Sequence, residues 1–521
     1  MNTWNNLYIR DFNNFEKCRQ VGLMKKTRTF MKVSCIMLFV ALIISPLQRI
    51  FSQEMWGVVN SNYAGINSNL INPAGMVDSK YWLDINIVTL DAFGENNSLY
   101  VPHEELYFLE ILSPAVDFGE ESPILKDTYD KERKLHANFS TRIELPSFML
   151  CKGDQAFGFQ LSVRGAGSTR GIEHHTSKFI YEGIDFEPQH DEFYELRKMK
   201  TAALSWGEIA LSYSKAFTTF SSTYMAIGGT LKKTMGLGGS FFNVPYANYI
   251  IYDDSTLSVE ELDAQYASSM PMDYSNNEYT TDHGLTLGGG WAADLGFVFQ
   301  KKRDGNGFMR VRQLCAQKWS SYKYKIGISI LDLGYVKFRD NAFVYSFDNA
   351  QTYWPGFDRF DPQNVDGFTS GFNTHFAHTA EADEREFTIG LPTAVSLQYE
   401  WHPAGYWFFN TSFVYPTPVF KNSVIRPTQL SFTPRFEKRR FELSIPLSVY
   451  EWNRLRAGLA VRIWNLTIGT DYFSSWTGWF DFYGSDIYVS WKMSFAKGHC
   501  KKGRSDFHKG KRYYKDACPD F

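Results

Sequence analysis

The C-terminal third of the chain consists of short segments in which apolar and polar side chains alternate. In Phe441–Val449 the odd positions are Phe, Leu, Ile, Leu and Val, and the even positions are Glu, Ser, Pro and Ser. A β-strand points successive side chains to opposite faces, so this segment has one apolar and one polar face. The same alternation recurs over 455–463, 464–468 and 487–495. The pattern predicts a series of antiparallel strands that each present one face to an apolar medium.

Alternation of this kind predicts fourteen strands, near 81–90, 136–145, 155–165, 205–215, 223–233, 285–300, 321–335, 386–400, 406–415, 428–435, 440–449, 455–462, 464–472 and 486–495. The connections between them largely alternate in length. Lys152–Asp154 and His402–Gly405 are short, whereas the long ones are 91–135, 166–204, 234–284 and 336–385. The connections 301–320 and 450–454 break the rule. Short periplasmic turns, long external loops and an even strand number are typical of outer-membrane barrels, and this parity predicts that both termini are periplasmic.

Two soluble architectures also show alternating strands. A propeller repeats a shared signature every roughly 40–50 residues, and the sequence contains no such repeat. A chain of β-sandwiches of this length needs several domains joined by polar linkers, and no linker is visible. We therefore expect an all-β fold, a closed antiparallel transmembrane β-barrel of about fourteen strands with long extracellular loops.

The N-terminal region predicts export. An apolar run over 33–44 follows a basic stretch formed by Lys25, Lys26, Arg28 and Lys32. Together with the small residue Ser52, these features match a secretory signal peptide, with Gln53 as the first mature residue and Met24 as an alternative start. The competing interpretation is a membrane anchor, for which the run is shorter than the roughly 20 residues needed.

Composition supports a membrane barrel. Aromatic residues make up 17% of the chain, with 44 Phe, 30 Tyr and 14 Trp, which suits aromatic girdles at two membrane interfaces. The mean hydropathy of −0.31 does not oppose this, because half of each barrel strand faces the lumen. The net charge of −2 gives no support for nucleic-acid binding. Cys500 and Cys518 either form a disulfide in an oxidising periplasm or stay as two thiols.

The segment before the first strand is rich in turn-forming residues. It contains Asn72–Gly75, in which Asn-Pro favours a turn and Gly75 permits left-handed backbone. Between 55 and 83 only Asp78 and Lys80 are charged, which favours burial. We expect a compact, turn-rich segment over 53–80.

Three short motifs near this segment carry a resemblance. Ser61–Gly65 reads S-N-Y-A-G, Asn72–Ala74 reads N-P-A, and Asp78–Asn86 reads D-S-x-Y-x-x-D-I-N. Ala517–Phe521 has a C-P-x-F ending. In these motifs the chain resembles a Bacteroidota family of outer-membrane β-barrels known as domain of unknown function 5723, over roughly 53–521. The N-P-A-G piece is also similar to long-chain fatty-acid transporters of the outer membrane, which have fourteen strands and an N-terminal plug.

The second resemblance implies that the N-terminal segment folds into the lumen; a loose periplasmic N-terminus is the alternative. The plug-like residues are then Asn62, Tyr63, Asn72, Pro73 and Gly75. Two prolines, Pro392 and Pro446, lie inside predicted strands on the lumen face. Proline cannot donate to a ladder, so each marks either a harmless bulge or, following this resemblance, a kink that weakens the wall and opens a lateral exit. Polar residues expected to face the lumen are Arg142, Glu144, Arg456, Arg462 and Lys492.

No pattern typical of catalysis is present. Glu173-His174-His175 is better explained as a solvated loop than as a metal site, and the spacing of Asp358, Asp361 and Asp366 does not fit a calcium loop. The chain has no G-x-S-x-G motif, no P-loop and no dinucleotide fingerprint. We expect no catalytic residue, no cofactor and no metal.

The sequence thus predicts a leader over 1–52, a plug-like segment over 53–80, a barrel over 81–495 and a basic periplasmic tail over 496–521. The function we expect is a non-enzymatic outer-membrane channel or transporter for a hydrophobic or small amphipathic solute. The alternative is a structural barrel that belongs to a secretion or surface-attachment apparatus. Expected partners are outer-membrane lipid, a hydrophobic small-molecule ligand and the barrel-assembly machinery.

Overall fold

A computed structural model describes residues 54–103, 126–127, 134–219, 223–280, 282, 284–303, 322–360, 362–376, 382–476 and 481–496. The predicted leader and the basic tail beyond residue 496 lie outside the described residues, as do Cys500 and Cys518. Among the described residues, no helix is both long enough and apolar enough to cross a membrane.

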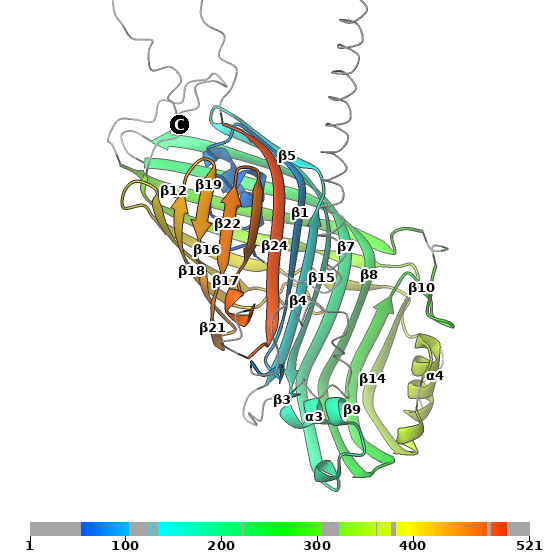
Figure 1. Ribbon diagram of the computed structural model, residues 1–521. Coiled ribbons are helices and arrows are strands. Elements are labelled where there is room, and N and C mark those ends of the chain that lie inside the picture. Colours follow the sequence, from blue (N-terminus) through cyan, green and yellow to red (C-terminus); the bar gives the residue numbers. More distant parts are fainter. Residues whose placement is uncertain are drawn as a thin grey trace, which may run out of the picture. The chain divides into compact units, whose positions relative to one another are not determined.

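The strands form a closed antiparallel wall of fourteen positions (Figure 1). In order they are β1 (Leu83–Asn96), β4 (Leu135–Glu144) with β5 (Ser147–Lys152), β6 (Gln155–Ile172), β7 (Phe193–Thr219), β8 (Thr223–Asp253), β12 (Gly288–Lys302), β13 (Tyr322–Phe338), β15 (Phe387–Gly390) with β16 (Ala394–Trp401), β17 (Trp407–Pro416), β18 (Gln429–Glu437), β19 (Phe441–Ser444) with β20 (Leu447–Tyr450), β21 (Arg454–Ala457) with β22 (Leu459–Ile463), β23 (Leu466–Thr470) and β24 (Gly484–Phe495). The first and last strands pair from Leu83–Phe495 to Glu95–Gly484 and close the wall. The predicted barrel is confirmed.

Four strands form an extension of the sheet beyond the wall, on the side of the long loops. Two of them, β7 and β8, continue out of the wall, and two, β9 (Thr256–Ser269) and β14 (Ala342–Pro355), are added to them. β7 and β8 pair as far as Phe193 and Ile250, β8 pairs with β9, and β9 pairs with β14. The sequence predicted 234–284 and 336–385 as loops, which was wrong for these strands. Their ladders contain register shifts, between Asn243 and Tyr246 for example, and each bulge moves the apolar positions out of a simple period of two.

Two helices pack on this extension through aromatic side chains. Phe372 of α4 (Val365–His375) lies 5.3 Å from Phe347 of β14, measured between ring centroids. Phe179 of α3 (His174–Glu182) lies 5.8 Å from Tyr249 of β8. The smaller elements are β2 (Leu99–Tyr100) with β3 (Lys126–Asp127), β10 (Met272–Asp273) with β11 (Glu278–Tyr279), η4 (Glu187–Gln189), η6 (Phe357–Arg359) and η7 (Phe473–Trp476).

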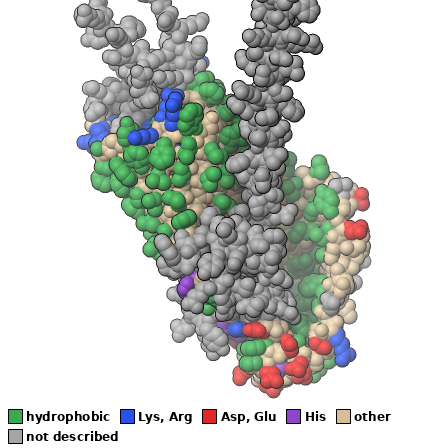
Figure 2. Space-filling model, viewed as in Figure 1, with side chains coloured by type: hydrophobic (Ala, Val, Ile, Leu, Met, Phe, Trp, Pro, Cys, Tyr) green, Lys and Arg blue, Asp and Glu red, His purple; other side chains and the backbone are tan. Residues whose placement is uncertain are grey.

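The wall is apolar on its outer face and polar on its inner face. On β6, Phe157 is 48% exposed, whereas Arg164, seven residues further along and therefore on the opposite face, is buried. Exposed apolar side chains recur on neighbouring strands, among them Leu211, Leu231 and Leu295. Figure 2 shows hydrophobic side chains covering much of the visible wall. An apolar exterior around a polar interior is the arrangement of a transmembrane barrel, with hydrocarbon outside.

Both strand prolines lie where a ladder is interrupted. Pro392 falls between β15 and β16, and Pro446 falls between β19 and β20. Backbone hydrogen bonds still cross the wall at these points, from Leu391 N to Gly334 O at 3.0 Å and from Gly458 N to Pro446 O at 2.7 Å. The register is the same on both sides of each proline, so each marks a short gap in the ladder of a closed wall and not a bulge.

Candidate functional site

Residues 54–81 form a compact segment enclosed by the wall. It contains two short 3₁₀ helices, η2 (Gly65–Leu70) and η3 (Pro73–Asp78). Its side chains reach strands on different sides of the lumen: Asn60 donates to Ser412 of β17 at 3.2 Å, and Asn69 donates to Ser212 of β7 at 2.9 Å. Figure 1 shows the segment, in dark blue, within the barrel. We call it the lumen segment.

The sequence of the lumen segment explains its local shape. Asn72 caps η3, because its Oδ1 accepts a hydrogen bond from Ala74 N at 3.0 Å, and Pro73 occupies the first helical position. Gly65 has a φ of 60°, which a residue without a side chain adopts readily. This turn directs Ile66 N to Asp84 Oδ2 at 2.9 Å, so the segment is attached to the start of β1.

Glycines in the wall allow the lumen segment to lie against the strands. A Cβ added at Gly228 of β8 would lie 2.5 Å from Ala74 N, and one added at Gly158 of β6 would lie 2.9 Å from Ile66 Cδ1. Gly296 and Gly327 face Asn72 in the same manner. At Gly228 the backbone of the wall meets the backbone of the lumen segment, and any larger residue there would push the segment away.

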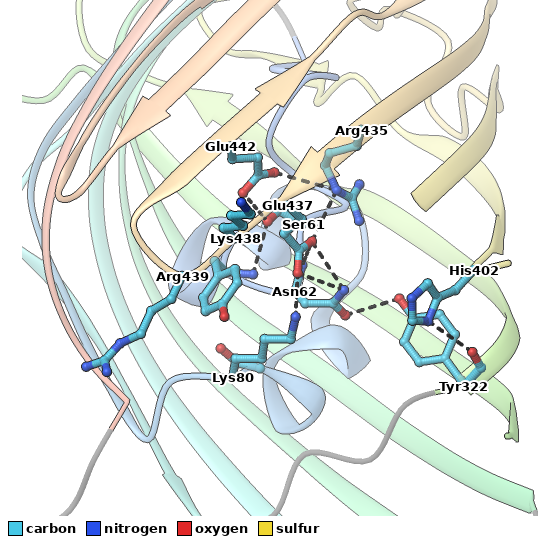
Figure 3. A network of polar contacts seen from close by, with 12 residues as sticks. Ser61, Asn62, Lys80, Tyr322, His402, Arg435, Glu437, Lys438, Arg439 and Glu442 are labelled. Carbon is cyan, nitrogen blue, oxygen red and sulfur yellow. Dashed lines mark hydrogen bonds and ion pairs between the residues drawn. The ribbon is translucent and has the colours of Figure 1, made fainter. Parts of the chain in front are cut away.

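A network of charged side chains holds the segment near the turn side of the barrel (Figure 3). Glu437 of β18 accepts hydrogen bonds from Asn62 N and Asn62 Nδ2, each at 3.2 Å. It also forms an ion pair with Lys80, whose Nζ lies 2.6 Å from Glu437 Oε1. Arg435 lies beside it, with Nε 3.2 Å from Glu437 Oε2 and Nη2 2.7 Å from Glu400 Oε2. All of these wall side chains are buried. The segment thus supplies a cation and an amide to a cluster of wall carboxylates.

A second charged cluster surrounds Asp332 of β13. Its carboxylate accepts two hydrogen bonds from Arg164, at 2.8 and 2.9 Å, and one each from Lys232 at 2.7 Å and Arg426 at 2.8 Å. Arg426 also approaches Glu54 of the lumen segment at 3.4 Å. Burial raises the pKa of the Glu54 carboxyl, and the Arg426 guanidinium opposes that shift.

The polar residues expected in the lumen have the following contacts. Gln160 donates to Glu144 at 2.9 Å, Arg462 pairs with Glu442 at 2.8 Å, and Lys492 Nζ donates to Ala64 O at 2.5 Å. Arg456 pairs with Glu95, and its guanidinium lies 3.9 Å from the centroid of the Tyr450 ring. Arg142 lines two small internal cavities. Of the plug-like residues, Tyr63 packs on Tyr81 at 5.2 Å between centroids, and Asn62, Asn72 and Pro73 are buried.

A family model described as "Family of unknown function (DUF5723)" matches residues 73–471. The chain belongs to this family. No curated protein matches it. Among solved structures, the toluene transporter TodX of Pseudomonas putida is 9% identical, with 85% of this chain and 97% of that chain covered and a TM-score of 0.31. A FadL homologue of Pseudomonas aeruginosa is 8% identical, with coverage of 86% and 99% and a TM-score of 0.20. Both identities and both TM-scores are low.

The lumen of this DUF5723 protein is filled over the described residues. Three internal cavities border the lumen segment or the two charged clusters, and they measure about 50, 20 and 10 Å³. The largest lies between the lumen segment and β12, β13, β16 and β17, and its lining mixes apolar Val59, Ile71 and Val298 with polar Asn62 and Gln398. The structure therefore shows a closed barrel.

Sequence reasoning missed a second segment that enters the lumen, the connection over 417–428. Val424 joins an apolar cluster with Phe338 and Ile389, Ile425 N donates to Ser168 Oγ at 2.8 Å, and Arg426 reaches Asp332. It also missed Asp332, Arg164 and Lys232 as a group. A charged residue within an otherwise alternating strand was the available signal, but the partners come from strands far apart in the sequence.

The described residues hold no group of three His, Cys, Asp or Glu side chains placed to bind a metal ion. His175 lies at the start of α3, where its Nε2 is 2.9 Å from Glu195 O and its ring stacks on Tyr194 at 4.7 Å between centroids. Burial lowers the pKa of His175. Asp358 and Asp366 lie on η6 and α4, and Asp361 lies outside the described residues.

Proposed function

We propose that this DUF5723 protein is a non-enzymatic outer-membrane channel for a small amphipathic or hydrophobic solute, and that the lumen segment closes it. The observation that carries the proposal is the enclosed position of residues 54–81, which are no part of the wall's ladder. The wall is complete without them, since β1 pairs with β24 on one side and with β4 and β5 on the other. Displacing the segment would open the part of the lumen that it fills and leave the barrel intact.

The contacts of the lumen segment support displacement. The backbone hydrogen bonds at its turns stay within it, as from Asn72 N to Ser68 O at 3.0 Å, whereas the contacts to the wall described above involve side chains. Many of those are polar, for example Ser61 Oγ to Glu442 Oε2 at 2.8 Å. Water or a polar part of a solute can replace such contacts, because the net free energy of a hydrogen bond to a charged group is only about 1.5–3 kcal/mol.

The chemistry of the solute is proposed from the 50 Å³ cavity beside the lumen segment. Its lining carries amide and carboxylate groups from Asn62 and Glu400 beside the apolar Ile71 and Val298. A site of this composition favours a molecule with an apolar body and one polar group. We further propose that one of the two gaps in the wall ladder, at Pro392 or Pro446, is where such a solute leaves toward the membrane, since the ladder is already interrupted there.

The proposal also includes the route to the membrane. The leader exports the chain, the barrel-assembly machinery inserts it, and both termini lie in the periplasm. The described ends of the barrel agree with the last point, because Leu83 and Phe495 are paired, at the same end of the wall as the Lys152–Gln155 turn. Protease protection of intact cells tests this orientation.

A cross-link between the lumen segment and the wall tests the function. Asn69 Nδ2 lies 2.9 Å from Ser212 Oγ, so the double variant Asn69→Cys, Ser212→Cys places two thiols at this contact. We expect oxidation to abolish uptake of a radiolabelled fatty acid by intact cells of a Gram-negative host, and reduction to restore it. The two single variants, treated with the same oxidant, are the controls. Equal uptake by the oxidised and reduced double variant would refute the closure mechanism.

The structural barrel is the second candidate, and the filled lumen favours it. The extension formed by β7, β8, β9 and β14 adds an outward platform with exposed aromatic side chains such as Tyr353 and Phe193. A scaffold of this kind would retain a stoichiometric protein partner after cross-linking in intact cells. It would also show no uptake in either redox state of the cross-linked variant.

A further inference from the structure

The outer face of the wall carries a hollow of about 810 Å³. It is lined by residues of β5, β6, β7, β8 and β12. Its exposed apolar side chains include Phe157, Tyr213, Leu211, Leu231 and Leu295. Since these residues belong to the apolar exterior, the hollow opens toward hydrocarbon.

The hollow has a specific cause in the sequence. Tyr213, Gly229 and Leu295 occupy one row across three paired strands, and Leu211, Leu231 and Ala293 occupy the next outward row. Gly229 and Ala293 are the small members, so the two rows leave a gap between larger side chains. On the opposite face of β8, Gly228 meets Ala74 of the lumen segment, so the hollow lies directly behind this contact.

A cation flanks the hollow on its turn side. Lys215 lies two residues from Tyr213 on the outward face of β7, about 7 Å along the strand. Its Nζ lies 5.6 Å from the centroid of the Phe217 ring, and no carboxylate of the described residues forms an ion pair with it. On the loop side, Lys233 is also outward, but it lies closer to a ring, 4.8 Å from the centroid of Trp291, and tryptophan is the stronger cation–π partner. Lys215 is therefore the cation better placed for an anionic group.

We propose that the hollow binds one acyl chain of an anionic phospholipid from the leaflet on the turn side, with the phosphate group at Lys215. The distance from Lys215 to Leu211 is four residues, or about 13 Å, which is close to half of the roughly 30 Å hydrocarbon core. An acyl chain that starts at the level of Lys215 thus reaches the far side of the hollow within its own leaflet. The lipid would rest on the wall directly behind the lumen segment.

Photolabelling of the full chain in lipid nanodiscs tests the site. The probe is a phosphatidylglycerol with a diazirine near the end of one acyl chain, mixed into phosphatidylcholine, and adducts are located by mass spectrometry. We expect adducts to concentrate on the residues that line the hollow. Filling the hollow with Gly229→Leu and Ala293→Leu should lower labelling there about tenfold. This factor corresponds to an acyl chain that buries about two fewer methylene groups against the wall. Thr411→Leu, on the outward face of β17, is the matched control.

The charge is tested separately. Lys215→Gln should remove the preference for phosphatidylglycerol over a phosphatidylcholine carrying the same diazirine, and Lys233→Gln should leave it unchanged. Uniform labelling around the barrel, labelling unaffected by the filling variants, or a preference lost through Lys233→Gln alone would overturn the proposal. If the double filling variant does not fold, Ala293→Phe replaces it. Labelling does not require transport, so this result and that of the uptake experiment are independent.

Discussion

Asp332→Asn should be among the most destabilising single changes in the barrel. The asparagine has nearly the same shape and tolerates the positive φ of 52° at this position, so neither packing nor backbone conformation accounts for the effect. What changes is the charge: one buried carboxylate contacts Arg164, Lys232 and Arg426 at 2.7–2.9 Å. Removing it leaves three buried cations with fewer counter-charges.

The magnitude follows from burial. Breaking a buried ion pair by removing one partner costs about 3–5 kcal/mol. Asp294 still pairs with Lys232 at 2.7 Å, and Glu208 still pairs with Arg164 at 3.2 Å. We therefore expect the lower limit, about 3 kcal/mol, which lowers the folding equilibrium constant roughly 150-fold. Urea unfolding in lipid vesicles, followed by tryptophan fluorescence and by gel mobility without heating, measures this value.

Glu386→Gln is the matched control. Lys337 Nζ and Glu386 Oε1 are 2.5 Å apart, closer than any pair around Asp332, but these side chains are 31% and 52% exposed. An exposed pair contributes at most about 1 kcal/mol. If the two variants lose similar stability, or if Asp332→Asn loses less than about 1 kcal/mol, the argument from burial is refuted.

Three further predictions concern the lumen segment and the external helix. Gly228→Val should displace the segment and raise single-channel conductance in planar bilayers, because its Cβ would overlap Ala74 N, whereas Gly229→Val, which faces outward, should not. Asn72→Ala removes a helix cap of about 1 kcal/mol and should speed amide exchange over η3 about fivefold. Asn72→Ser, which keeps a capping oxygen and lacks the amide nitrogen as Ala does, should not. Burial lowers the pKa of His175, so the unfolded state takes up a proton first as pH falls below about 6.5. We therefore expect the amides of α3 to lose exchange protection between pH 7.5 and 5. His175→Asn should remove this pH dependence.

The sequence predicted the wall because strand alternation is a local property. In β19 and β20 each outward apolar residue neighbours an inward polar one, whatever lies across the lumen. The same reasoning failed for β9 and β14, where bulges such as the shift between Phe347 and Ala350 disturb the period. The turn-rich character of residues 61–80 was also local, since Asn72 and Pro73 specify their own helix start.

By itself, then, the sequence determined a fourteen-stranded membrane barrel preceded by a compact segment. Only the tertiary structure decided what that segment contacts, which residues surround Asp332, and that the 417–428 connection folds inward. Arg164 and Asp332 are 168 residues apart, and Gly228 matters because it meets Ala74 across the lumen. Such contacts depend on barrel closure, which fixes which inward residues face one another. No local pattern of side chains carries that information.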